Sequence, residues 1–334
     1  MNSRSSRVAL FSLGGTIATA SVPGRDVADP FLSGEQLMAA VSGLAETDVD
    51  IEVHDLRRVP SSALTIEDIA ALAELVQARI AAGADGVVVT QGTDTLEETA
   101  FLLDLLYTGD APVVVTGAMR APMLAGADGP ANLLAAVQVA ASPVWRGLGC
   151  VVAFADQVHA ARWARKVHAS SVAAFASPSA GPIGTVAGGR ATLLFRPRKL
   201  PPLPAADGLR TVRVGLVTIV LGDDGELLQA AADRFDGLVI AAFGVGNVPA
   251  RLVPAIAGLA ARLPVVLASR TGAGSVLVSH RGLAGAENEL LTERGAISAG
   301  FLDPLKARLL LHVLLARNAN RDQLATAFAA YGGG

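Results

Sequence analysis

Four short polar segments stand where apolar runs of this sequence end, and they hold hydroxyl, carboxyl and amide side chains. They are Gly14-Gly15-Thr16, Ser61-Ser62, residues 91–95 and residues 117–120. In open α/β sheets, ligands bind beyond the carboxyl ends of the strands. Residues that directly follow a predicted strand are therefore the first candidates for functional side chains.

Thr16 follows paired glycines, a pattern that suits a nucleophile beside main-chain N–H groups. Glycines let the backbone approach a ligand closely, so their N–H groups could surround an oxyanion while the hydroxyl attacks a carbonyl carbon. The alternative is a tight turn with a solvated threonine, and the triplet alone favours it. Phosphate binding is disfavoured because the segment lacks the Gly-Lys-Ser/Thr ending of a Walker loop.

Thr93 and Asp94 precede a predicted helix over residues 96–107. Thr95 and Glu98 have the spacing of a capping box, and a helix needs only one cap. That leaves Thr93 and Asp94 at a helix N-terminus, where the partial positive charge can hold a substrate carboxylate. Ordinary turn chemistry explains the same two residues equally well.

The composition argues against several other classes of protein. The chain has 334 residues, with 27 Lys+Arg against 30 Asp+Glu, so it lacks the positive charge that nucleic-acid binding needs. The five histidines have no metal-site spacing and Cys150 stands alone, so we expect no metal. There is no Gly-x-Ser-x-Gly nucleophile elbow. Residues 244–249 begin like a dinucleotide fingerprint but lack its third glycine, so this signal is weak.

Short runs rich in Val, Ile and Leu predict β-strands, and several are continuously apolar, as strands covered on both faces must be. Helical patterns lie between them, the clearest at residues 65–81 after a capping box of Thr65 and Asp68. The alternation predicts α/β architecture with open, mainly parallel sheets and helices on both faces. The predicted strands are residues 8–13, 51–56, 86–90, 112–116, 150–155, 212–221, 237–243 and 264–268.

The length predicts about two domains at roughly 100–200 residues each. Four prolines within residues 197–204 suit an extended linker. We therefore expect a larger N-terminal domain over residues 1–189, a linker over 190–211 and a smaller C-terminal domain over 212–334. No run reaches the ~18 apolar residues of a membrane span, and the start lacks a signal-peptide core, so we expect a cytoplasmic protein that does not bind membranes.

Two longer motifs, Leu13-Gly14-Gly15-Thr16-Ile17-Ala18 and residues 90–100, resemble the two signatures of the bacterial-type L-asparaginase/glutaminase family. The pair in this order is highly specific. The resemblance continues through residues 112–120, 128–133, 166–169, 244–247 and 304–308, so it covers nearly the whole chain.

The resemblance implies hydrolysis of a side-chain amide, typically of asparagine to aspartate and ammonia, without a cofactor. Thr16 matches the family's nucleophile. Thr93, Asp94 and Lys166 match its threonine, aspartate and lysine set, which handles proton transfer. The resemblance also implies a homodimer or homotetramer with sites between subunits. The residues implied in substrate binding are Gly15, Ser61, Ser62, Gly92 and Asn247.

The implied chemistry agrees with the residue types. An amide nitrogen is a poor leaving group, so two steps through a threonyl ester replace one difficult hydrolysis. No histidine motif stands ready to activate the hydroxyl, which makes a lysine beside an aspartate the candidate proton carrier. From the residues alone, Lys166 is one of several basic groups on a solvated loop with Arg162 and Arg165. The family match instead favours Lys166 as a functional residue over an ordinary solvated lysine.

The sequence departs from the family pattern at two places. The family's loop after the nucleophile usually carries a tyrosine, but residues 18–60 contain none, and the only tyrosines are Tyr107 and Tyr331. The secreted branch has a glutamate from the neighbouring subunit where this chain has Ser279. Polar residues that stand on the loop are Arg25, Asp26, Asp29 and Ser33, and those near Ser279 are Glu287 and Glu289.

Three questions stay open. An amino-acid-binding protein with the same fold would bind aspartate without releasing ammonia. An amidase subunit of a tRNA-dependent amidotransferase is also similar, although we expect an additional N-terminal domain there and the first signature here begins by residue 8. Asparagine and glutamine differ by one methylene, worth only ~1–3 kcal/mol in discrimination, so dual activity is compatible with the sequence.

Overall fold

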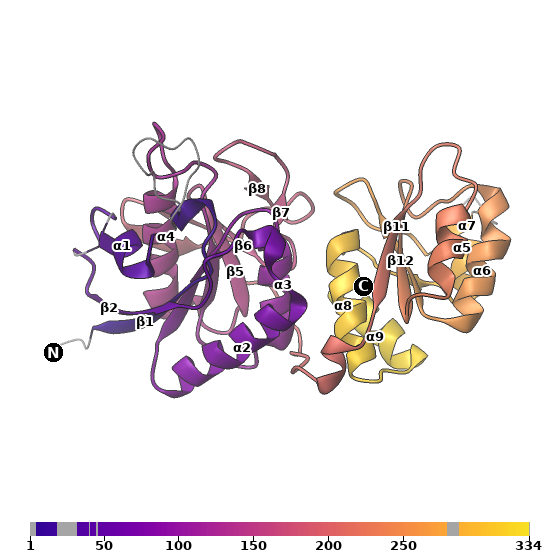
Figure 1. Cartoon of the computed structure of the whole chain (residues 1–334), viewed down its shortest axis with the longest axis horizontal. Coiled ribbons are helices and arrows are strands. Elements are labelled where there is room, and N and C mark those ends of the chain that lie inside the picture. The colour runs from indigo at the N-terminus through magenta and orange to yellow at the C-terminus, as the bar shows by residue number, and fades with distance from the viewer. Residues whose placement is uncertain (1–4, 19–31, 40, 45, 279–286, 334) are drawn as a thin grey trace. The chain divides into compact units, whose positions relative to one another are not determined.

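The chain divides into two compact units, Met1–Pro204 and Ala205–Gly334 (Figure 1). The computed structural model describes residues 5–18, 32–39, 41–44, 46–278 and 287–333. Each unit has its own sheet and its own helices. The predicted class of two mainly parallel α/β domains is confirmed.

An eight-stranded sheet with the order β10-β9-β6-β5-β4-β3-β1-β2 forms the centre of the first unit. The pairs from β2 to β5 are parallel, and those from β5 to β10 are antiparallel. A separate two-stranded sheet pairs β7 with β8. The strands are β1 (Ser6–Ser12), β2 (Val49–Asp55), β3 (Gly86–Thr90), β4 (Val113–Thr116), β5 (Cys150–Phe154), β6 (Gln157–Ala160), β7 (Arg165–Lys166), β8 (Phe175–Ala176), β9 (Gly184–Ala187) and β10 (Arg190–Leu193).

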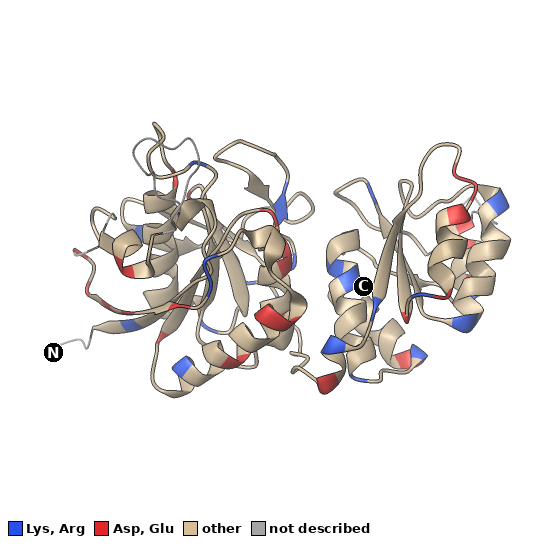
Figure 2. Cartoon of the chain, in the orientation of Figure 1, with Lys and Arg blue, Asp and Glu red and all other residues tan. Residues whose placement is uncertain are grey.

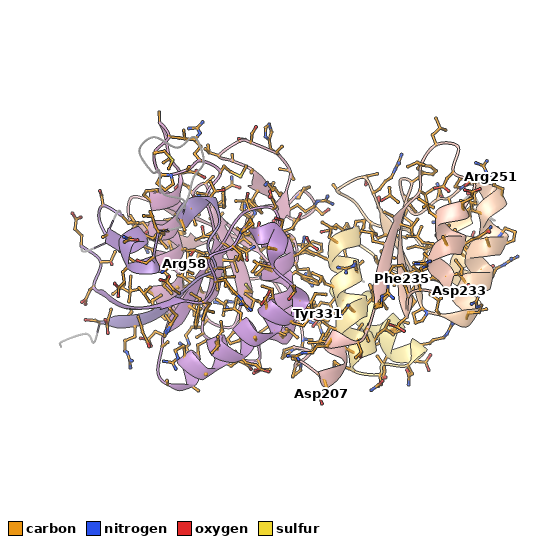
Figure 3. All side chains as sticks on the ribbon, in the orientation of Figure 1. Arg58, Asp207, Asp233, Phe235, Arg251 and Tyr331 are labelled. Carbon is orange, nitrogen blue, oxygen red and sulfur yellow. The ribbon has the colours of Figure 1, made fainter. Side chains whose placement is uncertain are left out.

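The central parallel strands are covered on both faces, as their continuous apolar runs predict. Val87, Val88 and Val89 of β3 are each 0% exposed. Helices α1 (Gly34–Ala39) and α4 (Gly129–Ala141) pack on one face. Helices α2 (Ile66–Ala81) and α3 (Leu96–Leu106) contact strands of the sheet from the other face (Figure 1). The side chains drawn in Figure 3 fill the space between sheet and helices.

One predicted helix cap is confirmed and another is wrong. At the start of α2, Thr65 Oγ1 accepts a hydrogen bond from Asp68 N, and the Asp68 carboxylate accepts one from Thr65 N. At the start of α3, Thr95 makes no side-chain cap. Its hydroxyl donates instead to the Ser61 carbonyl oxygen at 3.0 Å. The Thr95 side chain therefore bonds to the loop after β2 and does not cap the first turn of α3.

The second unit is built on a four-stranded sheet with the order β11-β12-β13-β14, in which all pairs are parallel. Helix α8 begins where the Asp303 carboxylate accepts hydrogen bonds from Leu305 N and Lys306 N, and the buried Lys306 Nζ donates to Asp303 at 2.7 Å. The elements are β11 (Val214–Thr218), α5 (Glu226–Ala232), β12 (Gly237–Ala242), α6 (Val253–Arg262), β13 (Val265–Ser269), α7 (Glu287–Glu293), β14 (Ile297–Ser298), α8 (Pro304–Ala316) and α9 (Arg321–Tyr331). Single 3-10 turns are η1 (Thr16–Ala18), η2 (Ser61–Ala63), η3 (Pro143–Trp145), η4 (Asp207–Arg210) and η5 (Ala250–Leu252).

The antiparallel end of the first sheet includes part of the stretch predicted as a linker. Gly188 and Gly189 have φ of +55° and +74°, as the two-residue type I′ turn of a hairpin requires. They join β9 to β10, so residues 190–193 of the predicted linker 190–211 belong to the sheet. The division between the units falls at Pro204, after the proline-rich segment.

Figure 2 shows Lys and Arg interspersed with Asp and Glu on the elements of both units, as expected from 27 basic and 30 acidic residues. None of the helices in the described ranges combines the length and the hydrophobicity that crossing a bilayer requires.

One buried carboxyl group gives the first unit a predictable pH dependence. Asp104 in α3 accepts a hydrogen bond from Cys150 N at 2.8 Å, and burial raises the pKa of its carboxyl group to about 6. Because this pKa lies above the usual value of 3.8, the folded state binds the proton more tightly, and stability falls as pH rises from about 4 to about 6.

We therefore expect Asp104→Asn to raise the free energy of unfolding by about 1–3 kcal/mol at pH 8 and to change it little at pH 4. The amide oxygen of asparagine can still accept from Cys150 N. Urea unfolding at both pH values measures the difference. Equal differences at pH 4 and pH 8 would contradict the assignment.

Candidate active site

The first sheet reverses its strand order between β1 and β3. From β1 the chain goes to β2 on one side, then to β3 on the other side and on to β4 and β5. In such sheets the crevice for ligands lies beyond the carboxyl ends of the two strands at the switch point. The loops at this point hold Thr16 after β1 and Thr93 after β3.

The two loops touch through their main chains at Gly15 and Gly92. Gly15 has a φ of +81°, and a Cβ built on it would lie 2.1 Å from the Gly92 nitrogen. Only glycine fits so close an approach at positive φ. The Leu13 N–H also donates to the Thr90 carbonyl oxygen at 2.9 Å. Thr16, half-buried at the start of η1, therefore lies next to the loop that carries Thr93.

Gly15→Ala tests this contact. We expect the free energy of unfolding to fall by about 2–5 kcal/mol, from ~1–2 kcal/mol of left-handed backbone strain and ~1–3 kcal/mol of overpacking. Gly181→Ala is the matched control, because Gly181 has a φ of +75° and nothing within 4 Å of its Cβ position. Urea unfolding of both variants separates strain from crowding. Equal losses would argue against a tight contact between the loops.

Lys166 joins Thr93 and Asp94 in one hydrogen-bonded group. Its Nζ donates to Thr93 Oγ1 at 2.9 Å and to Asp94 Oδ1 at 2.7 Å. Thr93 is 6% exposed, the Lys166 side chain 15% and the Asp94 side chain 72%. The ammonium thus bridges a buried hydroxyl and a carboxylate that faces solvent. Because the Thr93 hydroxyl accepts from this ammonium, its own proton is directed to another acceptor.

Ser61 fastens the loop after β2 to the loop after β3. The buried Ser61 Oγ accepts a hydrogen bond from Asp94 N at 3.2 Å, and the Ser61 carbonyl oxygen accepts from Thr95. A Cβ on Gly92 would lie 2.8 Å from Ser61 Oγ. Ser62, the next residue in η2, is exposed. Within the part of the chain that the structure describes, the main-chain N–H groups of Gly92 and Thr93 donate no hydrogen bond.

Asn132 and Asp128, at the start of α4, hold the loop after β4 against the site. Asn132 Nδ2 donates to the Gly117 carbonyl oxygen at 3.0 Å, and its Oδ1 accepts from Ala155 N at 2.9 Å. The Asp128 carboxylate accepts from Met119 N and Arg120 N. A Cβ on Gly117 would lie 2.5 Å from the Gln91 carbonyl oxygen, so this loop packs directly on the Thr93 loop. The sequence alone did not predict a positioning role for Asn132, because its partner Ala155 lies 23 positions away along the chain.

The other candidates lie in other elements of the chain. Asn247 belongs to the second unit, in the loop after β12, where its N–H donates to the Phe243 carbonyl oxygen at 2.9 Å. Ser33 forms a reciprocal cap with Gln36 at the start of α1. Tyr107 and Tyr331 are buried, and Tyr107 donates to the Ala111 carbonyl oxygen. Glu287 and Glu289 lie in the first turn of α7. Arg25, Asp26, Asp29 and Ser279 lie outside the described residues.

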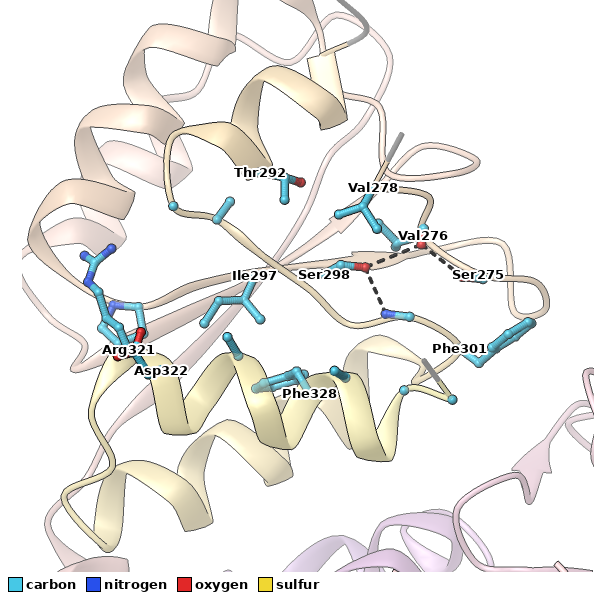
Figure 4. Close-up of a pocket in the computed structure, with 18 residues that line it drawn as sticks. Ser275, Val276, Val278, Thr292, Ile297, Ser298, Phe301, Arg321, Asp322 and Phe328 are labelled. Atoms are coloured by element: carbon cyan, nitrogen blue, oxygen red, sulfur yellow. Dashed lines mark hydrogen bonds between the residues drawn. The ribbon is translucent and has the colours of Figure 1, made fainter. Parts of the chain in front are cut away.

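A pocket of about 520 Å³ in the second unit holds none of the predicted site residues (Figure 4). It lies beside β14 and α9, with Val276 and Val278 across from Phe328. Ser298 Oγ accepts from Gly300 N and donates to the Val276 carbonyl oxygen, so backbone groups already use this hydroxyl. The other polar side chains that line the pocket are Ser275, Thr292, Arg321 and Asp322, and none of them is a predicted site residue. Among the described residues, no group of three or more His, Cys, Asp or Glu side chains could hold a metal ion.

Comparisons with known proteins agree with this geometry. The family model described as "Asparaginase, N-terminal" matches residues 7–199, and "Glutaminase/Asparaginase C-terminal domain" matches residues 213–328. The chain is 43% identical over 326 residues to a "Probable L-asparaginase" of Deinococcus radiodurans, covering 96% of this chain and 97% of the relative. It is 34% identical over 319 residues to an "L-asparaginase" of Bacillus licheniformis, covering 93% and 95%.

A solved structure is similar over the same extent. The probable cytoplasmic L-asparaginase from Campylobacter jejuni matches with a TM-score of 0.85 and 30% identity, over 98% of this chain and 100% of that chain. Both units are therefore found together in a solved relative.

Proposed function

The chain belongs to the asparaginase family, and from this premise we propose that it hydrolyses the side-chain amide of L-asparagine to L-aspartate and ammonia. The observation that carries the proposal is the Lys166 ammonium on Thr93 and Asp94, at 2.9 and 2.7 Å, next to the loop that bears Thr16. This arrangement offers a hydroxyl nucleophile beside a proton-handling group, which amide hydrolysis needs.

We propose Thr16 as the nucleophile. Its hydroxyl oxygen attacks the amide carbon, and its proton passes to the group of Thr93, Asp94 and Lys166. When the tetrahedral intermediate collapses, the C–N bond breaks and the nitrogen takes up a proton and leaves as ammonia. Water then attacks the threonyl ester, which releases aspartate and restores the hydroxyl. Formation of the threonyl ester and its hydrolysis thus replace one difficult direct hydrolysis of the amide.

The main-chain N–H groups of Gly92 and Thr93 are candidates for the oxyanion site. Neither donates a hydrogen bond within the described residues. Such donors are effective because they are fixed before the charge develops on the carbonyl oxygen. The Gly15 contact holds this segment in place, so its donors need not reorganise during the reaction.

Ser61, Ser62, Gly15, Gly92 and Asn247 are proposed to bind the substrate. Ser62 offers an exposed hydroxyl directly after Ser61, which itself fixes the Asp94 loop. Asn247 lies in the loop after β12 of the second unit. On the family resemblance we also propose a homodimer or homotetramer that shares its sites between subunits, and we propose that it works in the cytoplasm.

Ammonia release tests the proposal. The purified chain is incubated separately with L-asparagine, L-glutamine and D-asparagine, with the Thr16→Ala protein as control. We expect release from L-asparagine that the control lacks, and a weaker release from glutamine, since one methylene is worth only ~1–3 kcal/mol. Aspartate that raises the melting temperature without any ammonia release would favour an amino-acid-binding protein, a function that the comparisons do not support.

A further inference from the structure

The hairpin that carries Lys166 is separate from the eight-stranded sheet. Lys166 lies in β7, which pairs only with β8 among the described strands, in the register Lys166 with Phe175. The two hydrogen bonds from Nζ therefore depend on how this hairpin is held against the main sheet. A shift of ~1 Å in a reacting group can cost about 10²-fold in rate.

Two side-chain contacts hold the β8 side of this hairpin. The Phe175 ring packs on Phe154 of β5, with ring centroids 4.7 Å apart. One residue beyond β8, the Ser177 hydroxyl lies 3.0 Å from Nδ1 of His159 in β6. His159 pairs with Val152 in the main sheet, so its position is set by the strand ladder. The His159 to Ser177 contact thus links the hairpin to the rigid part of the unit.

A histidine at position 159 lowers the stability of the folded state. It is 0% exposed, and its Nε2 has no hydrogen-bond partner in the described part of the chain. Burial lowers the pKa of His159 to about 4, so the ring is neutral at physiological pH. An apolar side chain of similar size would fill the place without leaving a buried nitrogen unsatisfied, which destabilises the folded state. Stability therefore does not explain the histidine, whereas a directional contact to Ser177 does.

We propose that His159 is a positioning residue for Lys166, acting through Ser177 to fix the β7–β8 hairpin over Thr93 and Asp94. The inference rests on the proposed amidohydrolase function. His159 touches no reacting group in this arrangement. Its effect is on where the Lys166 ammonium lies, and so on the proton-transfer steps rather than on substrate binding.

Three variants test the link. His159→Leu removes the hydrogen bond, Ser177→Ala removes its partner with a smaller change in volume, and His159→Asn keeps a polar group near the place of Nδ1. We expect His159→Leu and Ser177→Ala each to lower kcat for L-asparagine by about 10–100-fold with KM within about twofold. His159→Asn is expected to stay within about threefold of the wild-type kcat.

His312→Leu serves as the matched control, because His312 is another buried histidine, in α8 of the second unit, bonded to the Leu209 carbonyl oxygen. It is expected to lower the melting temperature and leave kcat unchanged. Wild-type kcat in both His159→Leu and Ser177→Ala would overturn the proposal. So would a loss in His159→Asn as large as that in His159→Leu, because a polar contact would then be irrelevant.

Crystal structures of the wild-type and Ser177→Ala proteins give a readout that needs no turnover. We expect the distance from Lys166 Nζ to Thr93 Oγ1 to lengthen by ~1 Å in the variant. An unchanged distance overturns the positioning role. If the wild-type protein releases no ammonia from any amide, the proposed function fails, while the distance still decides whether the contact positions Lys166.

Discussion

Replacing Thr16 with alanine is expected to abolish ammonia release from L-asparagine and to leave the fold intact. Loss of a covalent nucleophile removes the ester route altogether, so kcat should fall by about 10⁴-fold or more. The methyl group of alanine fits at the first position of η1, where Thr16 is only half-buried. A steady-state ammonia assay measures the loss, and the melting temperature reports on the fold.

Thr16→Ser is the matched variant, because it keeps the hydroxyl and loses only the methyl group. We expect it to retain activity within about tenfold of the wild type. Aspartate should still raise the melting temperature of Thr16→Ala, since the groups proposed to hold it are unchanged. Near-normal turnover by Thr16→Ala would overturn the nucleophile assignment and direct attention to another hydroxyl.

The Thr93→Ala variant is expected to show the second large loss, a fall in kcat of about 10²–10⁴-fold, as is typical for a positioned acid-base group. The Thr93 hydroxyl is buried and accepts the hydrogen bond from Lys166 Nζ at 2.9 Å. Among the described residues, alanine leaves Lys166 Nζ bound only to the exposed Asp94, so the ammonium has no buried partner there through which to pass a proton. The ratio of kcat values, measured with saturating L-asparagine, gives the effect.

Thr93→Ser separates the hydroxyl from the methyl group. The Thr93 methyl packs near Gly117, 3.4 Å from where a Cβ would lie on that residue, so serine loosens the packing but keeps the acceptor. We expect Thr93→Ser to retain most of the activity. A merely twofold change in Thr93→Ala would instead make Thr93 an ordinary turn residue.

Parallel strands and the loops that follow them were predictable from the sequence because both depend on local patterns. Buried runs such as residues 86–90 become strands, and the rule for carboxyl ends of strands then picks out the loops of Thr16 and Thr93. Lys166 is different. Nothing in its neighbourhood distinguishes it from Arg165, and only the family match singled it out. Its contact with Asp94 spans 72 positions of the chain.

Hydrogen bonds between residues that lie far apart in the chain could not be predicted from the sequence. Thr95 has the spacing of a capping box, yet its hydroxyl bonds to Ser61, 34 positions earlier. The link between His159 and Ser177 also depends on tertiary structure, because it exists only once β6 and β8 are brought together. Local sequence preferences predict only the structure of a single segment. The partners of these side chains come from other segments, which the tertiary fold brings near.

The contact between Gly15 and Gly92 bears on how the active site can change during evolution or redesign. Main-chain atoms of Gly15 and Gly92 meet directly at this point, so the substitution of a neighbouring side chain does not enter the contact itself. Residues around the substrate can then be exchanged, one or several at a time, to favour a longer or differently charged amide. We therefore expect a library that keeps Gly15 and Gly92 and varies exposed side chains near the proposed site, such as Ser62, to contain many folded members.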